Sequence, residues 1–392
     1  MNIAEIFAKY DPSQITIGVL GGHSALDVCH GAKQHGFRTV AVCQKGRTQT
    51  YAKYYKTRIK NGQQVGCIDH VIEVEKFGDV VLPEVQQQLR DLNCVFVHNR
   101  YFWTYCDFEK VEHEFKVPIY GSRKLIRLEE RDVPKNQYWL LEQAGIRIPK
   151  MFSIPKLQKM GPMVGFAEEP QEDIDRLTLT KVNNAVRTYE RENFVAKDWA
   201  QWLEIVNNKI TDGLITFEDI QVAVVEEFIL GAQINFNYFY DPITDELELM
   251  GTDMRRQTNL DGVLRLPAHQ QLLVDDLMTY VKHIETGHVA ITCKESLLEK
   301  AFIAGENFIA ACKKHAPEPL IGPFALQGAI DTANNKEELV VFDVSFRIPG
   351  SPGTRFTPYS GYKYGESLSF GQRIGMHIQE ALDAGNLEKL LT

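Results

Sequence analysis

The chain has 392 residues, of which 44% are hydrophobic and 24% charged, and its formal net charge at pH 7 is −9. This composition is typical of a folded protein. No apolar run approaches the roughly 18 residues that span a bilayer. The acidic net charge argues against a nucleic-acid partner, because binding its phosphates needs clustered Lys and Arg. The seven cysteines form no CxxC pair and the N-terminus lacks the apolar stretch of a signal peptide, so we expect reduced thiols in a soluble cytoplasmic protein that binds neither membranes nor nucleic acid.

The first 120 residues alternate between strand and helix patterns. Strands are predicted at 15–22, 38–44, 70–77 and 94–99, and helices at 24–36 and near 80–92. This alternation predicts a parallel sheet with helices on both faces, in which ligands bind beyond the carboxyl ends of the strands.

Three polar loops follow strands of this sheet and are expected on one rim: "GGHS" (21–24), "QKGR" (44–47) and "HNRYF" (98–102). The first two supply candidate ligands for an anionic substrate, namely His23, Ser24, Lys45 and Arg47. No GxGxxG fingerprint of dinucleotide binding is present. The basic run at 45–60 is compatible with nucleic acid, but a substrate-phosphate loop followed by a solvated face fits the acidic chain better.

The remainder of the chain is richer in consecutive strands. Helices are expected at 135–150, 198–209 and 294–316, with a terminal helix pair at 371–391. Strands are expected at 177–182, 222–230, 232–240, 246–255, 324–331 and 338–347. The stretch 151–175 is expected to be an irregular connector. The fold class is therefore α/β at the front and α+β behind.

The stretch "VVFDVSFR" (340–347) places Asp343, Ser345 and Arg347 at every second position, so they share one face of a strand. If the neighbouring strand carrying Gln327 pairs with it, an amide oxygen and a carboxylate meet, which suits Mg²⁺. Arg347 would then clamp a phosphate. The alternative is a strand face that is simply solvated.

Two further features favour a nucleotide site. Lys181 ends the strand "LTLT", where a cation reaches phosphate, and Glu226 and Glu227 interrupt an apolar strand. The structural alternatives are a surface lysine and an edge strand with one exposed face.

The order of these elements resembles the ATP-grasp ligases, and the chain is similar to the PurP family of formate-dependent FAICAR synthetases along nearly its whole length. The resemblance is carried by "VPIYGSRKLIR", "VVEEFILGAQINFNYFY", "NLDGVLRLPA", "IGPFALQ" and "ELVVFDVSFR". It implies an ATP-grasp fold at 126–392, with a lid at about 150–230, preceded by a Rossmann-like parallel α/β domain at 1–125.

The resemblance also implies a reaction: formate, ATP and AICAR give FAICAR, ADP and phosphate through formyl phosphate, with Mg²⁺ or Mn²⁺ and in purine biosynthesis. It assigns catalysis to Lys181 and Arg347 and the metal to Gln327 and Asp343. The nucleotide would contact Lys181, Glu226 and Glu227. The ribonucleotide would contact His23, Ser24, Asn259, Arg265 and Thr354. Family members form trimers or hexamers, so a homo-oligomer is expected.

The chain departs from the family at the site. The glycine-rich lid loop of the family is replaced by the glycine-free run 182–194, where Arg187 and Arg191 would have to contact the phosphates. Glycine lets backbone N–H groups approach phosphate, so this change bears directly on ATP binding.

Two other differences lie near the substrate. The family's "PHGSF" is "HNRYF" here, which puts Arg100 and Tyr101 at the substrate rim, and the loop 347–355 is longer. The metal carboxylate is Asp343 where Glu is usual. Two alternatives therefore stay open: a paralogous ligase for another carboxylate and amine, and an inactive nucleotide-binding relative.

Overall fold

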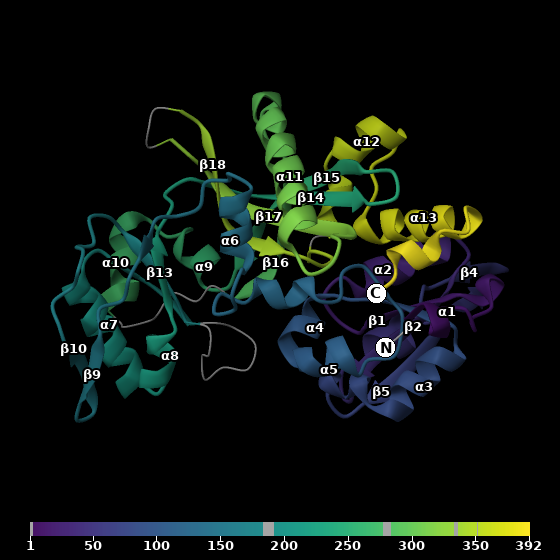
Figure 1. Ribbon diagram of the computed structural model, residues 1–392, viewed down its shortest axis with the longest axis horizontal. Coiled ribbons are helices and arrows are strands. Elements are labelled where there is room, and N and C mark those ends of the chain that lie inside the picture. The colour runs from purple at the N-terminus through teal and green to yellow at the C-terminus, as the bar shows by residue number, and fades with distance from the viewer. Residues whose placement is uncertain (1–2, 183–191, 277–283, 333–335, 351) are drawn as a thin grey trace.

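The computed structural model describes residues 3–182, 192–276, 284–332, 336–350 and 352–392. Three sheets of four or five strands carry the fold, and two short hairpins accompany them (Figure 1). Among the described residues, no helix has the length and apolar character required to cross a bilayer.

A parallel five-stranded sheet occupies the first 120 residues, as the alternation of patterns predicts. Its order is β5-β2-β1-β6-β7. The strands are β1 (Thr16–Leu20), β2 (Arg38–Gln44), β5 (His70–Val74), β6 (Cys94–Val97) and β7 (Ile119–Tyr120); the helices are α1 (Ile3–Phe7), α2 (Ala25–Gln34), α3 (Pro83–Asp91), α4 (Arg100–Tyr105) and α5 (Phe108–His113). The exposed hairpin of β3 (Arg58–Lys60) and β4 (Gln63–Val65) lies within and just after the basic run.

The loops after β1 and β6 meet because β1 has β2 on one side and β6 on the other. The order of strands reverses at this point, which is where parallel α/β sheets bind ligands. The Asn99 side chain, after β6, donates a hydrogen bond to the backbone oxygen of Leu20 at 3.0 Å. The rim predicted from "GGHS" and "HNRYF" is therefore a single structural unit.

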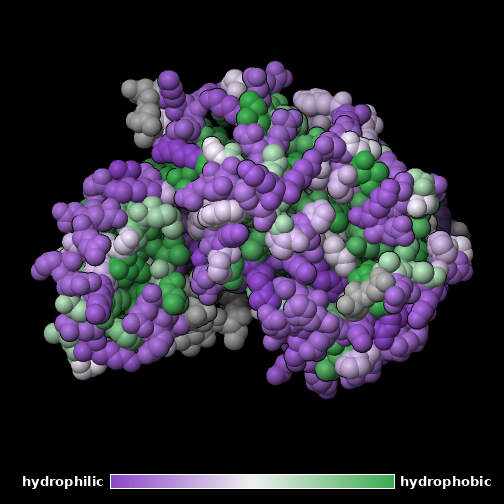
Figure 2. All heavy atoms as spheres, in the orientation of Figure 1, coloured by the Kyte–Doolittle hydropathy of each residue, from purple (hydrophilic) through white to green (hydrophobic). Residues whose placement is uncertain are grey.

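A four-stranded sheet, ordered β12-β11-β13-β8, forms a smaller lobe at the left of Figure 1. Its elements are β8 (Met151–Phe152), β11 (Thr178–Val182), β12 (Glu192–Ala196), β13 (Val224–Glu227), α7 (Trp199–Thr211) and α8 (Phe217–Gln221). The buried Trp202 side chain lies at its core and donates to Thr180 Oγ1 at 2.9 Å. Figure 2 shows hydrophobic residues gathered on this part of an otherwise largely hydrophilic face.

The irregular connector expected at 151–175 is partly wrong. It contains β8 and an antiparallel hairpin of β9 (Leu157–Met160) and β10 (Met163–Phe166). Gly161, with φ of 68°, and Pro162 make the turn, so this proline joins two strands instead of marking irregular chain.

An antiparallel five-stranded sheet, ordered β16-β15-β14-β17-β18, forms the centre of the molecule. The elements are α6 (Gln137–Gln143), β14 (Ala232–Asp241), β15 (Glu246–Gln257), α9 (Leu260–Val263), α10 (Ala268–Asp276), β16 (Glu285–Ile291), α11 (Glu295–His315), β17 (Gly322–Asp331) and β18 (Glu338–Ser345). The long helix α11 packs on it through Phe308, whose ring lies 6.0 Å from that of Phe324. Strand β16 was not anticipated.

The C-terminal segment returns to the first domain. Helix α12 (Tyr359–Tyr364) is followed by α13 (Phe370–Asp383), which crosses α2 in close contact. A Cβ built on Gly371 would lie 1.9 Å from the backbone oxygen of Asp27, so only glycine fits. The second helix of the expected terminal pair is a single 3₁₀ turn, Leu387–Leu390. The boundary at 125/126 stays a prediction, and the first domain also packs against this late segment.

Candidate functional site

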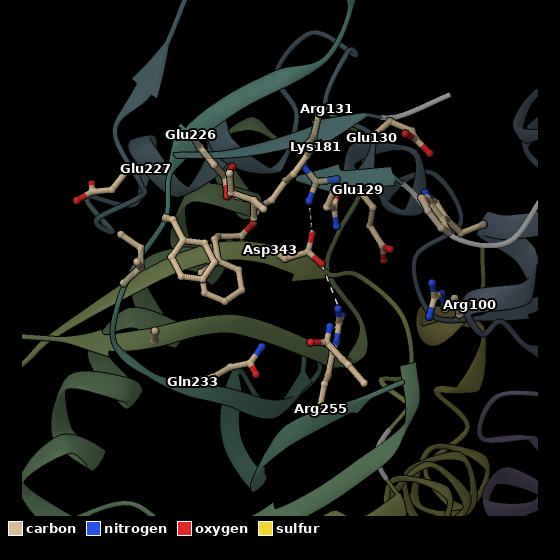
Figure 3. Close-up of a pocket in the computed structure, with 18 of the residues that line it drawn as sticks. Arg100, Glu129, Glu130, Arg131, Lys181, Glu226, Glu227, Gln233, Arg255 and Asp343 are labelled. Atoms are coloured by element: carbon tan, nitrogen blue, oxygen red, sulfur yellow. Dashed lines mark hydrogen bonds and ion pairs between the residues drawn. The ribbon is translucent and has the colours of Figure 1, made fainter. Parts of the chain in front are cut away.

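A cavity of about 900 Å³ lies where the three sheets approach one another. Arg100 lines it from the first domain, Lys181 and Glu226 from the small lobe, and Arg255 and Asp343 from the central sheet (Figure 3). Ligand pockets commonly form at such junctions, and this volume is within their usual range.

Gln327 and Asp343 are partners in the ladder between β17 and β18, just before the register shifts at Gly328. The guanidinium of Arg255 contacts both: its Nη2 donates to Gln327 Oε1 and lies 3.8 Å from Asp343 Oδ2. One cationic group thus reaches both oxygen groups at once. This donor set of hard oxygens fits Mg²⁺.

The Asp343 carboxylate contacts two arginine side chains, Arg131 and Arg255. Burial alone raises the pKa of Asp343, but the neighbouring charges of Arg131 and Arg255 outweigh burial and hold that pKa below its usual value. Arg131 Nη2 donates to Asp343 Oδ1 at 3.1 Å. Asp343 is therefore an ionised carboxylate at neutral pH. Sequence reasoning missed both arginines because only the tertiary fold brings them to β18.

Lys181 is buried and directed into the cavity from β11. Its Nζ lies 2.5 Å from Glu226 Oε1 and donates to Tyr138 Oη and to the Phe342 backbone oxygen, at 3.0 and 3.1 Å. Burial lowers the pKa of Lys181, but the Glu226 charge outweighs burial and raises that pKa above its usual value. The surface alternative for Lys181 is therefore wrong.

Glu227 faces away from Lys181 and is bound at the outer side of the lobe. Its carboxylate accepts from Arg176 Nη1 at 3.1 Å and from the Lys150 backbone N–H at 3.2 Å. The backbone after β13, residues 228–231, lines the cavity together with Glu226 and Glu227. Arg187 and Arg191 lie outside the described residues.

Arg347 lines the cavity on the same face as Asp343, as the alternation predicts. Its Nη2 donates to Glu129 Oε2 at 3.2 Å, and Glu129 also accepts from the Phe346 backbone N–H at 2.9 Å. Burial raises the pKa of Glu129 above its usual value. Ser345 Oγ accepts from Gln327 Nε2 at 2.9 Å, so Asp343, Ser345 and, just beyond the end of β18, Arg347 share one face.

A second, much smaller recess adjoins the cavity where the rim of the first domain meets the central sheet. Its volume is about 20 Å³, roughly that of one water molecule. Glu285 of β16 is the centre of a polar cluster here, with His23 Nε2 at 3.6 Å, Arg100 Nη1 at 3.4 Å, Arg255 Nε at 3.6 Å and His288 Nε2 at 2.9 Å. Burial lowers the pKa of His23 to about 4, so this imidazole is neutral at pH 7.

The pKa of His288 is raised and the pKa of its partner Glu285 is lowered. Burial lowers the pKa of His288, but hydrogen bonds to Asp253 and Glu285 more than compensate and raise it to about 9. Burial raises the pKa of Glu285, but hydrogen bonds with His23 and His288 outweigh it and hold that pKa far below its usual value. His288 is therefore a fixed positive charge at neutral pH.

Some predicted substrate residues lie at the recess. His23 lines it, and Ser24 Oγ donates to the Pro349 backbone oxygen at 2.9 Å. Tyr101 lies beside Phe77, with ring centroids 4.7 Å apart and the ring planes tilted by 57°, and its ring would lie 2.0 Å from a Cβ on Gly22. Tyr101 therefore packs tightly against the first rim loop.

Other predicted substrate residues are not gathered there. Lys45 is exposed and paired with Glu75 at 2.9 Å, and Arg47 lies over the Phe77 ring. Arg265 is exposed on the loop after α9, Asn259 precedes α9 with φ of 44°, and Thr354 is buried beside Gly251. Within the described parts of the chain, none of these five lines either cavity.

Comparisons with known proteins agree along the whole chain. Residues 17–152 match the family described as "Protein of unknown function (DUF1246)" and residues 201–392 match "Domain of unknown function (DUF1297)". The chain is 34% identical over 391 residues to the "5-formaminoimidazole-4-carboxamide-1-(beta)-D-ribofuranosyl 5'-monophosphate synthetase" of Methanopyrus kandleri, covering 100% of this chain and 98% of that one. The protein of the same name from Methanocaldococcus jannaschii is 35% identical over 392 residues, with the same coverage.

Solved structures share the fold. The IMP biosynthesis protein PurP from Thermococcus kodakaraensis superposes with a TM-score of 0.65 at 23% identity, covering 96% of this chain and 100% of that chain. An ADP complex of N5-carboxyaminoimidazole ribonucleotide synthetase superposes with a TM-score of 0.56 at 11% identity, covering 92% and 79%. The expected ATP-grasp architecture with a parallel-sheet N-terminal domain is thereby confirmed.

Proposed function

This chain belongs to the family of 5-formaminoimidazole-4-carboxamide-1-(beta)-D-ribofuranosyl 5'-monophosphate synthetases, the PurP family, and from that premise we propose that it is an ATP-dependent C–N ligase of purine biosynthesis. It joins formate to the 5-amino group of AICAR and yields FAICAR, ADP and phosphate. The observation that supports this most is the convergence of Lys181, Asp343 and Arg347 on one cavity large enough for a nucleotide, with Gln327 of the adjoining recess paired to Asp343 across the strand ladder.

The reaction has two steps. A formate oxygen attacks the γ-phosphorus of ATP, the bond to the β–γ bridging oxygen breaks, and ADP leaves. The amine of AICAR then attacks the carbon of formyl phosphate, the C–O bond to phosphate breaks, and the amine loses a proton. Phosphoryl transfer of this kind depends on positioning and charge neutralisation rather than on a protein nucleophile.

Lys181 and Arg347 supply the positive charge for the first step. Both line the cavity, and both are paired with a carboxylate, Lys181 with Glu226 and Arg347 with Glu129. These partners hold the cations in place, and phosphate oxygens compete with them on binding. Charge-assisted hydrogen bonds to phosphate are the strong ones in such sites.

Gln327 and Asp343 would hold the divalent metal, because their oxygens already share one cationic partner. When bound, Mg²⁺ supplies charge neutralisation of the ATP phosphates. The adenine would lie along the backbone at 226–231, and the ribonucleotide at the rim beside His23 and Ser24. Family membership also favours a homo-oligomer in the cytoplasm.

A coupled ADP-release assay tests the proposal. We expect ADP release that requires ATP, Mg²⁺, formate and AICAR together, and that Asp343→Asn reduces to background. Glu338→Gln is the matched control, because Glu338 lies on the same strand but pairs with Arg147 near the surface. ADP release by Asp343→Asn at the wild-type rate would overturn the assignment of Asp343.

A second candidate is a ligase for another carboxylate and amine. It is favoured by the rim, where the Arg100–Glu285 pair lines a recess of only about 20 Å³ and the ring of Tyr101 packs against Gly22 of the first rim loop. The same assay with other carboxylates and imidazole amines discriminates the two. Turnover with such a pair, and none with formate and AICAR, would establish the second candidate instead.

A further inference from the structure

We propose that Arg255 is an internal counter-cation between Gln327 and Asp343, and that a divalent metal loads by displacing its guanidinium from these two oxygens. This inference rests on the proposed metal role of Gln327 and Asp343. Nη2 of Arg255 donates to Gln327 Oε1 and lies 3.8 Å from Asp343 Oδ2. A guanidinium and a dication on the same two oxygens would repel each other, so the two states exclude one another.

The two arginines on Asp343 differ in their freedom to move. Arg131 is 4% exposed, lies over the Tyr138 ring at 5.8 Å and donates to Asp343 Oδ1. Arg255 is 28% exposed and lines both the large cavity and the recess. Figure 3 shows them approaching Asp343 from opposite sides. Arg131 is therefore the fixed partner and Arg255 the exchangeable one.

Glu285 gives the displaced guanidinium an alternative partner. Its Oε2 already lies 3.6 Å from Arg255 Nε and 3.4 Å from Arg100 Nη1. When the Arg255 guanidinium leaves Gln327 and Asp343, the Glu285 carboxylate still compensates its positive charge. The side chain therefore does not have to cross open solvent to reach a partner. The same movement changes the ion cluster that lines the recess, so metal loading and the shape of the recess are coupled through Arg255.

Metal binding to the full-length protein tests this inference without turnover. Free Mn²⁺ is measured by electron paramagnetic resonance as Mn²⁺ alone is titrated into wild type, Arg255→Gln, Arg256→Gln and Asp343→Asn. We expect the Kd of Arg255→Gln to fall at least about ten-fold. Arg256→Gln removes the same charge one residue away, where the side chain is half exposed and pairs with Asp261 at 3.6 Å, and should match wild type.

Each outcome has a distinct meaning. A Kd for Arg255→Gln that is unchanged, weaker, or lowered only as much as in Arg256→Gln overturns the displacement. Asp343→Asn that binds Mn²⁺ like wild type instead overturns the metal assignment on which it rests. Thermal unfolding of each variant confirms that it is folded, and Arg255→Lys, which keeps the charge but cannot fork between two oxygens, should lie between wild type and Arg255→Gln.

Discussion

Replacing Lys181 by Met tests the buried ion pair at the edge of the cavity. The two side chains of this pair are 8% and 2% exposed, and Nζ lies 2.5 Å from Glu226 Oε1. Methionine keeps the apolar stem but removes the ammonium, and leaves the Glu226 carboxylate to the hydrogen bond from Tyr138 at 2.6 Å. Removing one member of a buried pair costs about 3–5 kcal/mol, so we expect the free energy of unfolding of the small lobe to fall by about that amount.

Urea unfolding followed by tryptophan fluorescence measures this loss, because Trp199 and Trp202 lie in the core of the same lobe. The double variant Lys181→Met with Glu226→Gln removes both charges and should recover at least about half of the lost stability. Lys159→Met, which breaks an exposed pair with Glu218 in this lobe, is the control and should unfold like wild type. A double variant as unstable as the single one would show that packing, and not charge pairing, dominates.

Two further predictions concern the recess. Because the pKa of His288 is raised to about 9 from its ordinary 6.5, its charged contacts stabilise the fold fully below about pH 6.5 and are lost as pH rises through about 9. The difference in Tm between wild type and His288→Gln should shrink over that window, and a difference that grows with pH would contradict the assignment. Arg100→Gly with Tyr101→Ser frees Glu285 and the rim, and should lower KM for AICAR with little change in kcat, because bulk that opposes binding is removed. An unchanged or higher KM in steady-state kinetics would refute that view of the rim.

The shared face of Asp343, Ser345 and Arg347 could be predicted from sequence because it depends on local rules, whereas the meeting of Gln327 and Asp343 can be expected only on condition that their strands pair. Side chains alternate along β18, so the face that carries Asp343 also carries Ser345 and Arg347. A one-residue slip would turn Val344 outward and Asp343 into the core, so alternation fixes the face on which Asp343 lies, and the structure pairs Asp343 with Gln327. Lys181 and Glu226 followed in the same way from their places on β11 and β13.

The partners of these residues could not be predicted in that way. Arg131 lies on a loop, and Arg255 and Glu285 lie on β15 and β16 of the sheet that carries Asp343, so only the tertiary fold brings them to the site. Strand β16 could not be recognised from its own residues, because only its backbone pairing with β15 identifies it as a strand. Lys45 shows the opposite failure: a basic residue after a parallel strand is expected at the rim, but a nearby carboxylate, Glu75, binds it elsewhere.

The crossing of α2 and α13 has a consequence for how this protein is made. The Gly371 backbone N–H donates to the Asp27 carboxylate, 344 residues earlier in the chain. At a synthesis rate of about 5–20 residues per second, the ribosome needs roughly 20–70 s to deliver that partner. During this interval α2 emerges with an uncovered apolar face, so we expect the nascent first domain to depend on chaperones until the last helix arrives.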